Sequence, residues 1–142
     1  MDLYQQLIID HNQNPRNFSK LENASHSADG HNPLCGDVIT VSLIKRDGII
    51  EDIAFMGSGC AISKASASIM TSTLKGMKIE DAEVLFDNFH ILATTGESSG
   101  DMGKLSVLEG VHKYPARVKC ATLAWHTFQG ALNNSTETIK TE

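Results

Sequence analysis

Residues 37–55, with the sequence DVITVSLIKRDGIIEDIAF, decide the fold of this 142-residue chain. Apolar and polar residues alternate over residues 39–43, which is typical of a strand with one buried face. Asp47-Gly48 is a hairpin turn signal, and residues 49–55 continue as a returning strand. The sequence therefore predicts an antiparallel strand pair, and the other elements are arranged around it.

The segments on either side of this pair carry other patterns. Residues 21–33 hold only a weak strand signal, and residues 96–101 predict a flexible loop. Helical spacing or small apolar residues predict helices over residues 2–11, 61–75, 79–92, 105–111 and a last segment that begins at Arg117 or Cys120 and ends at Leu132. We therefore expect one α+β domain over residues 1–132, with a small antiparallel sheet of about three strands and helices packed on one face. The polar residues 133–142 predict a disordered tail.

Length and charge exclude several classes of protein. A chain of this length buries roughly 70% of the surface that its unfolded form exposes, so it needs neither a disulfide nor a metal to hold a core. The 17 acidic and 12 basic side chains give a net charge of -5, which argues against nucleic acid and anionic membranes as partners. No segment approaches the ~20 apolar residues of a membrane span, and the polar first residues do not resemble a signal peptide. We expect a cytoplasmic protein.

Three cysteines and one aspartate are the candidate chemical groups. Cys35 and Asp37 lie two residues apart before the first strand of the pair, and an extended backbone points such side chains to the same side. Cys60 follows the hairpin and should lie near Cys35, because the two ends of a hairpin are close together. Cys120, near the start of the last helix, would complete a set of four ligands, the number that zinc prefers. In a cytosolic chain, an odd and small number of cysteines favours metal ligands or reactive thiols over a disulfide framework.

Spacing alone leaves other interpretations open. Free cysteines are commonly buried for structural reasons, and Asp37 could simply cap a turn. Gly57-Ser58-Gly59 could cradle a phosphate, but without a following Gly-Lys-Ser a tight turn is the better interpretation.

The surroundings of two cysteines favour thiolates. Cys60 falls near a helix start, where unpaired N–H groups and the helix dipole stabilise negative charge. Arg117 and Lys119 lie close to Cys120 in the sequence, and their positive charges should lower the pKa of its thiol. We therefore expect a lowered pKa at both thiols.

Each cysteine lies in a distinctive block of sequence: NPLCGD at residues 32–37, GSGCAIS at residues 57–63 and RVKCA at residues 117–121. These blocks resemble the iron–sulfur cluster assembly proteins of the IscU/NifU N-terminal family. The residues Leu3-Tyr4 and NPRN at 14–17 also match that family's N-terminal helix and its end. The resemblance covers nearly the whole chain and implies a metal or sulfur site.

Two departures separate the chain from the scaffold branch of that family. Lys119 stands where scaffold members carry a histidine, and the stretch between the last two cysteines is longer around residues 88–113. Both features resemble the SufU-type branch of Gram-positive bacteria. That resemblance implies a zinc-dependent sulfur transferase, which accepts persulfide sulfur from a pyridoxal-phosphate cysteine desulfurase (SufS type) and passes it to downstream cluster assembly proteins.

The resemblance also implies roles for particular residues. Zn²⁺ would be bound by Cys35, Asp37, Cys60 and Cys120, with Cys35 as the sulfur acceptor. Arg117 would stabilise the charged sulfurs from outside this ligand set. The alternative is a scaffold on which iron or a [2Fe–2S] cluster is bound by the same ligands. In the first case the protein acts as a sulfurtransferase, and in the second it is a binding protein.

Overall fold

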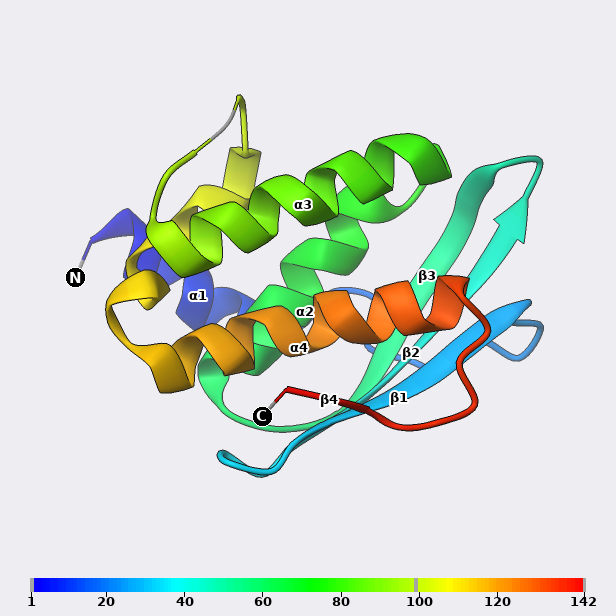
Figure 1. The fold of residues 1–142 in the computed structure, drawn as a ribbon, viewed down its shortest axis with the longest axis horizontal. Coiled ribbons are helices and arrows are strands. Elements are labelled where there is room, and N and C mark those ends of the chain that lie inside the picture. The colour runs from blue at the N-terminus through cyan, green and yellow to red at the C-terminus, as the bar shows by residue number, and fades with distance from the viewer. Residues whose placement is uncertain (1, 99, 142) are drawn as a thin grey trace.

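The computed structural model describes residues 2–98 and 100–141; Ser99 of the predicted loop and Met1 and Glu142 at the chain ends lie outside the described residues. Its elements, in chain order, are α1 (Leu3–Gln13), β1 (His26–Asn32), β2 (Asp37–Arg46), β3 (Ile49–Ser58), α2 (Ala61–Leu74), α3 (Ile79–Thr95), the 3-10 helix η1 (Gly103–Lys113), α4 (Pro115–Leu132) and β4 (Ile139–Lys140). Each predicted helix is present, and the hairpin of β2 and β3 is confirmed (Figure 1).

The sheet has four strands in the order β3-β2-β1-β4. β2 pairs antiparallel with both β1 and β3, whereas β4 pairs parallel with β1. The α+β class is therefore confirmed, but the sheet is mixed and four-stranded instead of antiparallel with about three strands. The weak strand signal before residue 33 corresponds to β1, whose polar composition hides its buried face.

Helices cover one face of the sheet. The inward side chains of β2 are almost fully buried, with Ile39 4% and Val41 0% exposed, whereas Val38 on the opposite face is 49% exposed. α2 and α4 contact the strands directly, and α3 lies on the far side of these two helices from the sheet (Figure 1). Ser66 of α2 donates a hydrogen bond to the Ala121 carbonyl of α4 at 2.6 Å, so two of the site-bearing elements are joined through the core.

The tail that we expected to be disordered contains β4. The Thr141 N–H donates to the His31 carbonyl at 3.3 Å, and the Thr141 hydroxyl donates to the Lys119 carbonyl at 3.4 Å. The side chain of Ile139 lies over Gly130, where an added Cβ would be 2.8 Å from it. Two residues are too few to show the alternation of apolar and polar side chains that indicates a strand, so the sequence of the tail could not predict this pairing.

The close approach of β1 to α4 generates the first prediction. A Cβ on Gly30 would collide with the Thr127 hydroxyl and lie 3.1 Å from Leu123. Gly30→Ala should therefore separate strand from helix and lower the free energy of unfolding by about 2–3 kcal/mol in urea denaturation. Gly110→Ala is the matched control, because a Cβ there meets nothing within 4 Å. Equal stability of the two variants would contradict this account of the packing.

α1 is fixed to α2 through a buried histidine. His11 is 1% exposed, and its Nδ1 lies 2.7 Å from the hydroxyl of Ser68. The Arg16 N–H donates to the same hydroxyl at 2.8 Å. Burial, and secondarily the charge of Arg16, lowers the pKa of His11 below its ordinary value. The folded protein therefore holds this ring neutral at a pH where the unfolded chain accepts a proton.

That shift sets a pH dependence of stability. Because the pKa of His11 is lower in the folded chain, the unfolded state binds more protons below about pH 6.5, and stability falls as the pH drops through that region. His11→Gln, which cannot titrate, should show a shallower loss of unfolding free energy between pH 7.5 and 5.5. Urea denaturation at several pH values measures it, and parallel curves for the two proteins would rule out this contribution.

Candidate metal site

The turn between β1 and β2 presents the first two ligands. Asn32 at the end of β1 pairs with Asp37 at the start of β2, and the Gly36 N–H donates to the Asn32 carbonyl at 2.9 Å. Gly36 has φ 73°, a left-handed conformation that glycine adopts without strain. Cys35 is exposed on this turn, whereas Asp37 is fully buried. The two side chains thus converge through a tight turn and not, as predicted, through the alternation of an extended strand.

Both oxygens of the Asp37 carboxylate accept hydrogen bonds. Oδ1 accepts from the Cys60 N–H at 2.9 Å, and Oδ2 accepts from Asn32 Nδ2 at 3.1 Å. Gly59 makes the first contact possible, because a Cβ there would lie 2.5 Å from Oδ1. The carboxylate therefore ties the β1–β2 turn to the start of α2.

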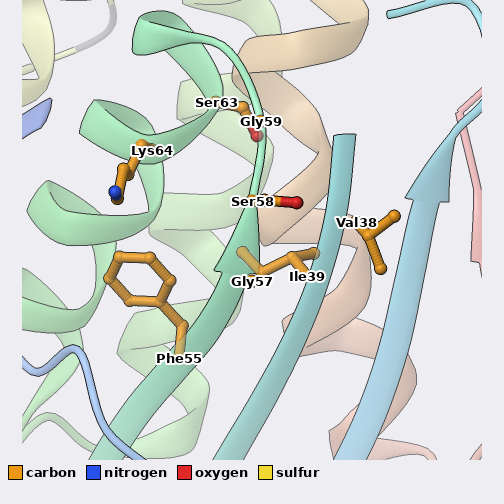
Figure 2. Close-up of a pocket in the computed structure, with 8 residues that line it drawn as sticks. All are labelled: Val38, Ile39, Phe55, Gly57, Ser58, Gly59, Ser63 and Lys64. Carbon is orange, nitrogen blue, oxygen red and sulfur yellow. The ribbon is translucent and has the colours of Figure 1, made fainter. Parts of the chain in front are cut away.

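Cys60 is the N-cap residue of α2, as its place near a helix start suggested. Its half-buried Sγ accepts from the Ser63 N–H at 3.4 Å. The preceding Gly57 has φ 141°, and its missing Cβ lets the backbone press against the Val38 carbonyl at the start of β2. Figure 2 shows this end of β3 beside Val38 and Ile39 of β2, with Ser63 and Lys64 of α2 nearby. Gly57 and Ser58 are thus the last residues of β3, paired with Ile39 and Val38, and Gly59 leads directly to α2, so neither the predicted tight turn nor a phosphate cradle describes this segment.

Cys120 lies on α4, whose first residue is Pro115, and is fully buried. Burial raises the pKa of its thiol well above the ordinary value, and the three other predicted ligands beside it add to the increase. The predicted lowering by Arg117 and Lys119 is therefore wrong. Arg117 is exposed in a groove with Tyr114, and Lys119 lines a different groove beside the tail.

The structure brings three of the four predicted ligands together, and Cys60 lies beside them. Within the described residues, the ligand atoms of Cys35, Asp37 and Cys120 all lie within 4.8 Å of one another. Cys60 joins them through its backbone bond to Asp37 and through its sulfur, which is among the groups that raise the Cys120 pKa. A carboxylate without solvent needs a compensating positive charge, and a bound cation would also take the place of the protons on the thiols beside it. Three sulfurs and one oxygen fit a divalent cation that accepts thiolate ligands, as zinc does.

Asn32 is the site residue that had no assigned role in the sequence analysis. It is fully buried, and besides its bond to Asp37 its Nδ2 lies 3.5 Å from Cys120 Sγ. Its presence in the block NPLCGD was the available signal. Its function could not be inferred there, because Cys120 lies 88 positions away in the sequence.

Comparison with known proteins places the chain in a family. The model of the NifU-like N terminal domain matches residues 3–121. The chain belongs to this family. The site residues Cys35, Asp37, Cys60 and Cys120 all fall within the matched segment.

Relatives of known name fall into two groups. The Bacillus subtilis protein "Zinc-dependent sulfurtransferase SufU" is 47% identical over 89% of this chain and 87% of its own length. The Streptococcus pyogenes protein "Iron-sulfur cluster assembly scaffold protein IscU" is 38% identical over 94% of this chain and 84% of its own. A crystal structure from Fervidobacterium islandicum, of a protein proposed as an iron–sulfur cluster assembly scaffold for the SUF system, matches with a TM-score of 0.85 and 32% identity, over 89% and 94% of the two chains. The names of the Streptococcus pyogenes and Fervidobacterium islandicum proteins both refer to iron–sulfur cluster assembly.

Across the part of the chain that the structure describes, no helix is both long enough and apolar enough to pass through a membrane.

The contact between Gly59 and Asp37 generates a prediction for metal binding. Gly59→Ala should push the carboxylate away from the sulfurs and weaken zinc binding about 10–100-fold, the range seen when groups that orient metal ligands are disturbed. Competition with a colorimetric chelator measures the affinity. Ser58→Ala, a change at the exposed neighbouring residue, is the control. Unchanged affinity in Gly59→Ala would show that Asp37 does not bind the metal.

Proposed function

We propose that this protein is a zinc-dependent sulfur acceptor in iron–sulfur cluster assembly. It takes persulfide sulfur from a pyridoxal-phosphate cysteine desulfurase and passes it to downstream assembly proteins. The observation that carries the proposal is the position of Cys35, an exposed thiol on a turn, beside the buried donors Asp37 and Cys120. The name of the 47% identical Bacillus subtilis relative supports it.

Cys35, Asp37, Cys60 and Cys120 would hold the metal in this proposal. Zinc, when bound, supplies positive charge that keeps thiolates deprotonated at neutral pH. Asp37 and Cys60 are fixed by the hydrogen bonds described above, and Cys120 is fixed by its burial in α4. Cys35 differs from them, because its turn lies at the surface and a partner protein can reach its sulfur.

Sulfur transfer to Cys35 is a thiol–disulfide type of exchange. The Cys35 thiolate attacks the outer sulfur of the persulfide on the desulfurase. A new S–S bond forms on Cys35, the S–S bond of the donor breaks, and the donor cysteine leaves as a thiolate. No oxidant or reductant is consumed, and the same exchange moves the sulfur onward.

Arg117 is the proposed source of positive charge outside the ligand set. It lies one helical turn before Cys120 at the exposed start of α4. Its side chain lines the groove with Tyr114, and we propose that it turns from there toward the anionic persulfide and stabilises it when a partner binds, an effect that Arg117→Ala would remove. The proposed location is the cytoplasm, where thiols remain reduced.

A cluster scaffold is the second candidate function. The same three sulfurs and one carboxylate could bind iron, and the 38% identical Streptococcus pyogenes relative is named a scaffold protein. Lys119 in place of the histidine of scaffold proteins favours the sulfur acceptor.

Substitution of Cys35 tests the proposed acceptor. The zinc-loaded protein should raise the turnover of a cysteine desulfurase, measured as sulfide or alanine release, and Cys35→Ala should reduce that stimulation to background. Cys35→Asp is the matched variant, because it keeps a metal ligand at the position but cannot form a persulfide. Both variants should therefore fail as acceptors, while Cys35→Asp retains more zinc than Cys35→Ala.

The properties of the purified protein distinguish the scaffold from the sulfur acceptor. A coloured protein that assembles a cluster and transfers it, and whose zinc form leaves desulfurase turnover unchanged, would support the scaffold and overturn the sulfur acceptor.

A further inference from the structure

We propose that Asn32 is a positioning residue for sulfur transfer, which holds Asp37 and Cys120 as fixed metal ligands and leaves Cys35 as the ligand that can depart. The inference rests on the proposed function, since it assigns the residue that separates the acceptor thiol from the anchoring groups.

The carboxamide of Asn32 contacts two of the predicted ligands. Nδ2 of Asn32 lies 3.1 Å from Asp37 Oδ2 and 3.5 Å from Cys120 Sγ. An amide nitrogen carries two hydrogens in one plane, so it can donate to both groups at once. Asn32 therefore joins a ligand on β2 to a ligand on α4.

The Asp37 carboxylate decides which way this carboxamide points. Oδ1 of Asn32 is buried and, within the described residues, has no hydrogen-bond partner. Exchanging the oxygen and the nitrogen would place Oδ1 against the Asp37 carboxylate, where two acceptors repel each other. A buried acceptor without a partner destabilises the folded state. Asn32 is thus poorly placed for stability but well placed to donate toward the site.

The predicted ligands differ in the hydrogen bonds that they accept. Asp37 accepts from Asn32 and from the Cys60 N–H, and Cys60 accepts from the Ser63 N–H. In the described part of the chain, no N–H group donates to the sulfur of Cys35. Hydrogen bonds to a ligand fix its orientation toward a metal, and losing them usually weakens metal affinity. The anchored groups therefore stay bound, and Cys35, which is exposed and free of such donors, is the thiolate that leaves to attack sulfur.

Two substitutions of Asn32 test this role. Asn32→Leu removes both donors but roughly keeps the side-chain volume and eliminates the unpaired Oδ1; Asn32→Ala removes the side chain. In both zinc-loaded variants we expect zinc release to a chelator to be about 10–100-fold faster than in the unchanged protein. Limited iodoacetamide labelling, mapped by peptide mass spectrometry, should modify Cys35 first in the unchanged protein and modify Cys120 relatively more in the variants.

The control is Thr127→Val, which changes a buried hydroxyl on α4 whose hydrogen-bond partner, among the described residues, is the Leu123 carbonyl of the same helix. It should keep the zinc release rate and the labelling order of the unchanged protein. Zinc release within twofold of the unchanged protein in both Asn32 variants, or an unaltered ratio of Cys35 to Cys120 labelling, would overturn the inference. Thermal unfolding of Asn32→Leu, expected to remain a single cooperative transition, separates the effect from loss of the fold.

If the variants do not fold, NMR spectra of the unchanged protein can test the role of Asn32 instead. The side-chain amide protons of Asn32 should shift in the NMR spectrum when zinc is added and should exchange slowly with solvent; protons that neither shift nor are protected contradict the role. Failure of the proposed function has a different signature. If the Asn32 substitutions change zinc release but the protein does not stimulate a desulfurase, the proposed sulfur transfer is wrong. The role of Asn32 in positioning the metal ligands then still holds.

Discussion

The buried carboxylate of Asp37 is the constraint on which the rest of the site depends. It lies without solvent at the first residue of β2 and accepts from the β1 end on one oxygen and from the α2 start on the other. These bonds fix the relative positions of two chain segments that each carry a cysteine. The close approach needs glycine at residue 59. Within residues 2–98 and 100–141 no basic side chain forms an ion pair with this carboxylate, so a bound cation would supply the missing positive charge.

Much of the fold followed from local patterns in the sequence. The alternation and the Asp47-Gly48 turn predicted the hairpin, and helical spacing predicted the helices to within a few residues. β4 was missed, because its two residues pair through the backbone with a distant strand and carry no pattern of their own. The lesson is that periodicity reports burial of side chains, whereas edge pairing by a short segment depends on tertiary contacts.

The candidate ligands were predicted from cysteine blocks, but their environments were not. Neighbours in the sequence suggested that Arg117 and Lys119 would favour a Cys120 thiolate. Lys119 is the immediate neighbour of Cys120 along α4 and points in a different direction, into the groove beside the tail. Arg117 lies one turn earlier, but at the exposed first turn of the helix, where it lines a groove with Tyr114 while Cys120 faces the core. Asn32 illustrates the same limit from the other side, because its contacts exist only after β1 and α4 have packed together.

The 88-position separation between Asn32 and Cys120 has a consequence for how the protein acquires its metal. The ligand set is assembled from a turn near the beginning of the chain and a helix near its end, so no partly folded intermediate lacking α4 contains it. Metal binding then stabilises only the complete fold and lowers the population of forms in which α4 has detached. A chain with metal bound at this site has therefore folded completely. A partner that recognises only the metal-bound protein would in this way avoid incompletely folded chains.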